Sequence, residues 1–166
     1  MARPSLEFLF TSIISALLEF YGVKEPPVPV AEFLRCPPPD LVGDLALVEW
    51  APFDYAFWRR GLAGLGRVYV PPRMRGSERR MALAAALFVG LCSTKNGRAI
   101  GLPEMPNDEA AAQKALFART LLMPTRLLPP HWKWLSADEL AARFDVPVEA
   151  ACLRLQELAA GNFSLD

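Results

Sequence analysis

The sequence predicts an α+β fold with an N-terminal helix, a small antiparallel sheet, a central buried helix and a C-terminal helical pair. Three observations favour this class. Apolar residues recur at helical spacing near both ends of the chain, and two short β-branched, apolar segments lie between them. Residues 81–91 are apolar almost all round, which is typical of a buried helix. With 166 residues, of which 52% are hydrophobic and 22% charged, the chain has the size of one domain with a real core.

The first helix is expected over residues 5–21, and Gly22 ends it. Its apolar positions at helical spacing are Leu6, Leu9, Phe10, Ile13, Leu17 and Tyr21. Prolines at 26–29 and 37–39 then leave room for one short helix at most. Residues 44–50 and 66–70 are predicted to be paired antiparallel strands beside the central helix.

Helix boundary signals divide the second half of the chain. Ser77 is predicted to cap the central helix. The third helix is expected from Asn107 or Asp108 to Met123, and Pro124 stops it. The tail begins with a capping box, in which Ser136 is followed three residues later by Glu139; this helix ends near Phe144. A second tail helix covers 148–160, before Gly161.

Localisation follows from the N-terminal segment and the cysteines. The apolar stretch 8–18 lies between Glu7 and Glu19 and precedes no small-residue cleavage site, so we expect neither a signal peptide nor a membrane partner. The three cysteines are odd in number and far apart: Cys36, Cys92 and Cys152. A disulfide framework is therefore not expected, and we place the protein in the reducing cytoplasm.

Four segments carry a resemblance to a known family. Residues 117–124, Phe-Ala-Arg-Thr-Leu-Leu-Met-Pro, resemble the F-A-x-x-L-L-M-P end of the helix after the active site in ImmA/IrrE-type zinc metallopeptidases. Residues 79–91 resemble the family helix R-x-F-x-x-A-H-E-x-x-H. Residues 26–34 and 135–151 are similar to the family's P-P-V-x-x-x-x-L stretch and its L-S-x-x-x-L-A-x-x-F-x-V-S-x-x-A tail. The segments occur in the family's order and span most of the chain.

This resemblance implies a zincin-like fold in one domain over residues 1–166. The peptidase-like core would cover 1–130, and the helical pair in 131–166 would pack on it. Active relatives, as the resemblance implies, cut transcriptional repressors inside bacterial cells.

The metal ligands of that family are missing from the matching positions. Ala85 stands where the first histidine belongs, Ala86 at the glutamate and Val89 at the second histidine. Gln113 falls near the expected third ligand. H-E-x-x-H works because two imidazoles four residues apart bind one zinc and the glutamate acts as general base, which alanine, valine and an amide cannot do.

The expectation is therefore a catalytically inactive, metallopeptidase-like protein with no metal and no cofactor. The alanine run suggests that the ancestral cleft is filled in or dry. Such a protein would act as a regulatory module that binds a protein partner, either a transcriptional regulator or a second copy of itself. A hydrolase with a displaced metal site remains an alternative, with His131 joined by Cys92, Glu109 or Glu104.

A basic region offers a second alternative, a nucleic-acid-binding regulator. The chain has 18 basic and 18 acidic residues, but residues 59–80 hold seven arginines and one acidic residue, Glu78. The candidate partner-binding residues here are Trp58, Arg59, Arg60, Arg67, Arg73 and Arg75. Arginines beside aromatic rings can bind single-stranded nucleic acid or an acidic protein. A solvated surface is the simplest interpretation.

The tail is a weaker nucleic-acid candidate. Its two helices could form a helix-turn-helix, but residues 136–160 hold only Arg143 and Arg154 against five acidic residues. DNA-reading helices need the opposite sign, so packing of the pair onto the domain is favoured. Trp132 and Trp134 are further partner-binding candidates. The favoured interpretation is that both tryptophans cover the core.

Overall fold

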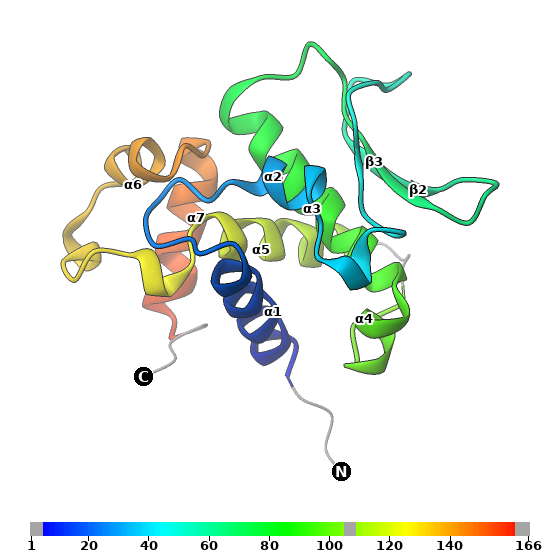
Figure 1. Cartoon of the computed structure of the whole chain (residues 1–166). Helices are drawn as coiled ribbons and strands as arrows, with labels where there is room; N and C mark the ends of the chain where they lie inside the picture. The colour runs from blue at the N-terminus through cyan, green and yellow to red at the C-terminus, as the bar shows by residue number, and fades with distance from the viewer. Residues whose placement is uncertain (1–4, 105–108, 162–166) are drawn as a thin grey trace.

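The structure is a computed structural model that describes residues 5–104 and 109–161, and it confirms the α+β class. Figure 1 shows the helices gathered around the centre of the molecule, with the sheet on one side. The helices are α1 Leu6–Phe20, α2 Val30–Arg35, α3 Gly76–Ser93, α4 Lys95–Ala99, α5 Glu109–Leu122, α6 Ala137–Phe144 and α7 Val148–Ala159. The strands are β1 Leu47–Val48, β2 Phe57–Arg60 and β3 Gly66–Tyr69. Single 3-10 turns occur at Pro39–Leu41, Thr125–Leu127 and Trp132–Trp134.

The N-terminal helix forms as predicted. The Ser5 hydroxyl accepts a hydrogen bond from the Phe8 N–H (3.2 Å) and satisfies one of the free donors of the first turn. Gly22 follows the helix with φ +63°, a conformation that side chains with a Cβ adopt at a cost. The buried residues of α1 lie between Leu9 and Leu18 and belong to the core.

The sheet corrects the predicted pairing. It is mixed, in the order β1-β3-β2, and β1 pairs with β3 in parallel, so the expected antiparallel pairing of 44–50 with 66–70 is wrong. The chain first forms β2, which the prediction missed, and then turns back through 61–65 to make an antiparallel hairpin with β3. Because this reversal happens between them, β1 and β3 run in the same direction. The Val68 and Val70 N–H groups donate to the Ala46 and Val48 carbonyls at 2.8 and 3.0 Å.

The core is built by α1, α3 and α5. The Phe88 ring of α3 stacks on the Phe117 ring of α5 with centroids 5.0 Å apart, and Phe10 of α1 meets both rings edge-on at 5.2 Å. The central helix begins two residues earlier than predicted: Arg75 is its N-cap and makes no side-chain cap, so Ser77 lies in the first turn. The predicted start of α5 at Asn107 or Asp108 lies outside the described residues.

The C-terminal pair confirms its predicted boundary signals. The capping box at Ser136 is present with both of its hydrogen bonds. Phe144 and Ala151 are fully buried and belong to the same apolar core as α1 and α3. Each tail helix therefore contributes a buried face to that core.

A buried ion cluster ties α7 to α5. Arg154 is fully buried, and its Nε donates to the Met123 carbonyl at 3.1 Å. Its guanidinium lies 3.6 Å from the carboxylate of Glu157, which also accepts a 2.8 Å hydrogen bond from Arg119. Burial lowers the pKa of Arg154 to about 10, although Glu157 acts in the opposite direction. Arg154, one of the two basic residues within 136–160, therefore contributes nothing to the surface charge of the tail.

None of the described helices has both the length and the apolar character needed to cross a membrane.

Candidate functional site

Three of the four positions matched to the zinc site line one pocket. Ala85, Ala86 and Val89 of α3 lie along a pocket of about 440 Å³ between α3 and β2. We call this pocket the α3–β2 groove; its lining residues are Tyr55, Ala56, Phe57, Trp58, Ala85, Ala86, Val89, Ser93 and Lys114. The side chains at these three positions therefore leave a pocket open beside α3. The part of α3 that these three residues form is apolar, as the alanine run predicts.

The helix α5 contributes a different residue from the one expected. Gln113, matched to the third ligand, is half-buried but does not line the groove. Lys114 does, and it is the one charged side chain among the lining residues. The groove therefore has aromatic and aliphatic walls with an ammonium group on its α5 side.

Close packing of α3 against the sheet shapes the groove. The Trp58 indole Nε1 donates to the Asp44 carbonyl at 2.8 Å, which fixes the ring between the sheet and α3. A Cβ added at Gly90 would lie 2.9 Å from Trp58 Cδ1 and nearer still to Leu45 Cδ2. Glycine at position 90 therefore allows the helix to approach the ring that forms the groove wall.

The strand β2 gives the groove a backbone edge. Phe57 pairs with Tyr69 and Arg59 with Arg67, and the Gly61 N–H donates to the Leu65 carbonyl at 2.9 Å. Ladder hydrogen bonds of an antiparallel pair alternate, so the backbone groups of Trp58 and Arg60 point away from β3. Among the described residues, no strand pairs with this side of β2. This edge can accept an added extended segment.

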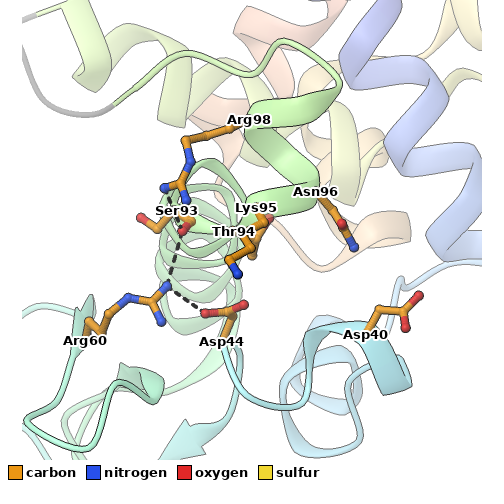
Figure 2. Close-up of a pocket in the computed structure, with 8 residues that line it drawn as sticks. All are labelled: Asp40, Asp44, Arg60, Ser93, Thr94, Lys95, Asn96 and Arg98. Atoms are coloured by element: carbon orange, nitrogen blue, oxygen red, sulfur yellow. Dashed lines mark hydrogen bonds and ion pairs between the residues drawn. The ribbon is translucent and has the colours of Figure 1, made fainter.

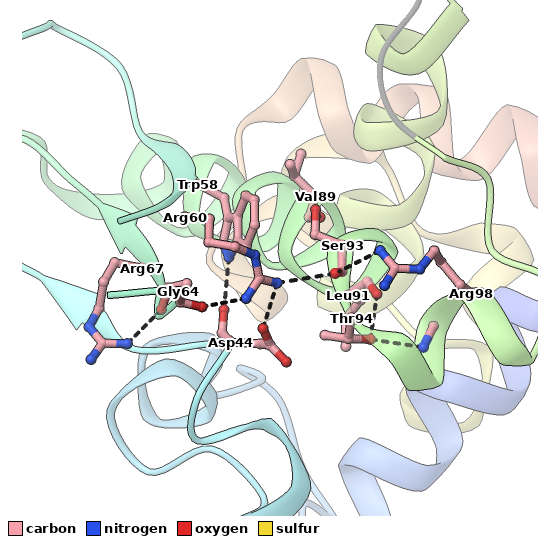
Figure 3. Close-up of polar contacts among 12 residues, drawn as sticks. Asp44, Trp58, Arg60, Gly64, Arg67, Val89, Leu91, Ser93, Thr94 and Arg98 are labelled. Carbon is pink, nitrogen blue, oxygen red and sulfur yellow. Dashed lines mark hydrogen bonds and ion pairs between the residues drawn. The ribbon is translucent and has the colours of Figure 1, made fainter. Parts of the chain in front are cut away.

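Arg60 connects several elements of the fold. Its Nη2 lies 2.6 Å from Asp44 Oδ1 and donates to the Ser93 carbonyl at 3.2 Å, while Nη1 donates to the Gly64 carbonyl at 2.6 Å. The guanidinium also lies over the Trp58 ring, 5.4 Å from its centroid. Arg60 thus joins the β2–β3 turn to the end of α3, as Figure 3 shows.

A second, polar pocket of about 340 Å³ lies beside Arg60 at the end of α3. Figure 2 shows Arg60 and Arg98 approaching the Ser93 carbonyl from opposite sides; Arg98 donates to it at 3.3 Å. The Thr94 hydroxyl caps α4 by accepting from the Gly97 N–H at 2.8 Å. Contacts of Arg60, Arg98 and Thr94 therefore hold α4 against the end of α3.

Most of the other arginines in the predicted basic patch are also engaged. Arg73 forms an ion pair with Asp54, and Arg75 donates to the Pro72 and Met74 carbonyls. Two further arginines of the region, Arg79 and Arg80, also bind other groups of the protein. Arg79 Nη2 donates to both carboxylate oxygens of Glu49 at 2.7 and 2.8 Å, and Arg80 donates to the Val28 and Asp145 carbonyls, both at 2.9 Å. Burial lowers the pKa of Arg80, against the opposing effect of Asp145. Arg67 also donates to a backbone carbonyl, that of Gly66, at 2.7 Å. Among the described residues, neither Arg59 nor Arg67 has a carboxylate partner.

The aromatic candidates in the tail divide into two kinds. Trp132 is half-buried, and the Lys133 ammonium lies 5.8 Å from its ring centroid. Trp134 is 87% exposed, so the interpretation that both tryptophans cover the core is wrong for Trp134. The 3-10 turn that holds both residues is too short to direct the two rings inward together.

The described candidates for a displaced metal site do not form a group, and the side chain of Glu109 lies outside the described part of the structure. Among the described residues, no three His, Cys, Asp or Glu side chains lie close enough together to hold a metal ion. His131 is exposed, whereas Cys92 is buried in α3, and burial raises the pKa of its thiol to about 12. Cys92 therefore stays protonated and has the character of a small apolar side chain.

Sequence reasoning missed the wall of the groove that β2 forms. The segment Phe57-Trp58-Arg59-Arg60 was interpreted as part of a basic patch, although aromatic residues are typical of strands and could have indicated β2. Lys114 had no comparable signal, since a single lysine in a helix is usually solvated.

No family model, no curated protein and no solved structure matches the chain.

Proposed function

We propose that this chain is a non-catalytic, metallopeptidase-like binding module whose α3–β2 groove receives an extended segment of a protein partner. The observation that carries the proposal is the meeting of Ala85, Ala86 and Val89 in one apolar groove beside the free edge of β2. The groove has the position that the resemblance gives to an active site, and its lining lacks carboxylate, imidazole and thiol groups.

The chemistry of the groove favours an extended peptide as occupant. Backbone groups at the free edge of a strand can hydrogen-bond to an added strand, and side-chain pockets then select its sequence. Tyr55, Phe57 and Trp58 offer apolar contact to alternate side chains of such a segment. Lys114 favours a carboxylate on it. We infer a segment with apolar side chains and at least one acidic residue.

The partner class follows from the resemblance. Active relatives cut transcriptional repressors, so a protein that keeps the groove and lacks the ligands would bind such a regulator without cutting it. A second copy of this chain is the other partner considered above. Size-exclusion chromatography with light scattering separates the two. A wild-type dimer that becomes a monomer in Val89→Trp, a variant that fills the groove, would assign the groove to self-association.

The proposal is tested with a displayed library of extended peptides. Wild-type protein should select peptides that combine apolar and acidic residues. Val89→Trp should abolish selection, because the indole fills the groove from α3. Ala142→Trp, on the exposed surface of α6, is the matched control and should select the same peptides as wild type. Equal selection by Val89→Trp and wild type would place peptide binding elsewhere and refute the proposal.

A reversal of charge sharpens the same test. Lys114→Glu should replace the acidic preference of the selected peptides by a basic one, because the carboxylate would then line the groove. An unchanged charge preference would show that Lys114 does not contact the peptide.

The link to the zinc family has a separate test. Ala85→His, Ala86→Glu and Val89→His, combined with Lys114→Glu, should create zinc binding, because all four positions line one groove. The same three changes with Gln113→Glu should bind zinc more weakly, since Gln113 does not line it. Calorimetry with zinc measures both. Absence of zinc binding in two folded variants would contradict the relation to a zincin site.

A further inference from the structure

A second surface lies on the opposite face of the sheet from α3. Side chains alternate along a strand, so Trp58 and Val68 face α3 while Phe57, Arg59, Arg67 and Tyr69 face outward. We call the outward-facing surface the outer sheet face; its residues are Trp50, Phe53, Tyr55, Phe57, Arg59, Arg67 and Tyr69. Phe57 and Tyr55 also reach the rim of the α3–β2 groove.

Aromatic rings cover one end of the outer sheet face. Phe57 and Tyr69 stack with centroids 5.1 Å apart, and Phe53 stacks on Tyr55 at 5.2 Å. Trp50 meets Tyr69 edge-on at 6.5 Å. Trp50, Phe53 and Tyr55 nevertheless keep 59, 50 and 56% of their surface exposed. Neighbouring exposed rings of this size mark a binding surface, because their apolar area is otherwise left in water.

Two arginines lie beside the rings without a neutralising acid. Arg59 and Arg67 are directly opposite each other in the β2–β3 pair, where like charges destabilise a sheet. No carboxylate among the described residues pairs with either of them; the nearby Asp54 is taken up by Arg73. An anion bound between the two guanidiniums would relieve this repulsion.

The rings share one concavity with Arg59 and Arg60, and Arg67 lies outside its lining. A pocket of about 430 Å³ is lined by Trp50, Phe53, Phe57 and Tyr69, with Arg59 at the same site. The aromatic walls and the guanidinium therefore act on a single ligand that has a flat apolar part and a negative charge next to it.

We propose that the outer sheet face binds single-stranded nucleic acid, with a base stacked against Trp50 or Phe53 and the adjoining phosphate held by Arg59 and Arg67. Bases of a single strand expose their flat surfaces, whereas those of a duplex are stacked on one another and cannot enter the pocket. An acidic peptide would satisfy the arginines but leave the exposed rings without a flat partner. The proposal does not rest on the function of the groove.

The test is fluorescence anisotropy with labelled oligothymidylate and oligouridylate of about 12 nucleotides, titrated over a range of salt concentrations. Both probes should bind alike, because rings and guanidiniums contact bases and phosphates and not the sugar. Trp50→Ala should weaken binding about tenfold at every salt concentration, since stacking is insensitive to salt. Arg59→Ala should lower the slope of log K against log salt by about 0.7, and Arg59→Ala with Arg67→Ala by about 1.4.

Matched controls use the same residue types elsewhere on the surface. Trp134→Ala and Arg143→Ala, both at exposed positions of the tail, should change neither affinity nor slope. All the substituted residues except the half-buried Arg67 are exposed, and thermal unfolding confirms that each variant folds.

Two results would overturn the proposal. Undiminished binding by the Trp50 and arginine variants would place any nucleic-acid contact elsewhere. Tight binding of polyglutamate that Trp50→Ala leaves unchanged, with no binding of either oligonucleotide at low salt, would assign the face to an acidic protein.

Discussion

Replacing Gly66 by alanine should destabilise the protein more than any surface change, because β3 passes against the backbone of the segment before β1. An ideal Cβ at Gly66 would lie 2.9 Å from the Asp44 carbonyl carbon, closer still to its oxygen, and 2.7 Å from Trp58 Cζ2. These distances fall short by about 0.7 Å of the roughly 3.5 Å at which carbon atoms normally meet. Two of the three near atoms belong to the backbone, so no side-chain rotation relieves the overlap.

The expected loss follows from what must move. Overpacking of this kind costs about 1 to 3 kcal/mol. Displacing Asp44 also weakens the bond from the Gly66 N–H to the Gly43 carbonyl (2.8 Å) and the bond from Trp58 Nε1 to the Asp44 carbonyl (2.8 Å), each contributing about 1 kcal/mol. The lower entropy of the unfolded alanine variant returns about 0.5 kcal/mol. The net loss should be about 3 kcal/mol.

Urea unfolding followed by circular dichroism measures this difference. Gly43→Ala is the matched control, because no atom lies within 4 Å of a Cβ built there and its backbone is unstrained. It should be as stable as wild type or slightly more so. A folded Gly66→Ala variant should also bind groove peptides less tightly, since Trp58 forms the groove wall. A Gly66→Ala stability within about 0.5 kcal/mol of wild type would refute the close approach of the two segments.

Three other predictions concern buried and titratable groups. Glu157→Gln should lower the free energy of unfolding by about 3 kcal/mol, because it leaves the buried Arg154 and the half-buried Arg119 without their carboxylate, whereas Glu149→Gln at an exposed position should change little in the same urea assay. At pH 8 a thiol reagent should modify two cysteines of the native protein and reach Cys92 only in denaturant; fast reaction of all three would contradict its burial. Hydrogen bonds from Ser136 lower the pKa of Glu139, so this contribution to stability is present above the ordinary glutamate pKa and is lost as pH falls through the lowered one. Glu139→Gln should therefore flatten the acid side of the stability curve, and an unchanged acid limb would count against the capping box.

Much of the helical part of the fold could be predicted, because its signals are local. The Ser136 capping box and Gly22 act within a few residues of the boundary that they set, and both lie where the sequence indicated. The sheet was predicted less well, since pairing depends on residues far apart. A four-residue strand of two aromatic residues and two arginines resembles a surface patch until β3 lies beside it.

The charge of the predicted basic patch also depends on residues that are far apart in the sequence. Seven arginines within residues 59–80 look like one basic surface in the sequence, yet Arg60, Arg73 and Arg79 are matched by Asp44, Asp54 and Glu49. Those acids precede the patch in the chain, and only folding brings them to it.

Both the family resemblance and the structure were needed to identify the residues of the groove. The resemblance pointed to Ala85, Ala86 and Val89, and the structure places the three together. The contribution of Lys114 in place of Gln113 depends on how α5 is rotated against α3. Adjacent residues of a helix are about 100° apart, so a rotation of this size decides whether Gln113 or Lys114 faces the groove, and the spacing to Met123 does not define it.

The alternation along β2 also limits how the length of this chain can vary. One residue inserted between Trp58 and Arg59 would turn the following side chains to the opposite faces, so that Arg60 would point away from Asp44 and Ser93 and the outward pair of Arg59 with Arg67 would be lost. The turn 61–65 between β2 and β3 has no such constraint, because its residues are exposed and their side chains do not have to alternate between the two faces of the sheet. Insertions and deletions should therefore be tolerated in the turn and excluded from the four residues of β2, apart from paired changes that restore the register.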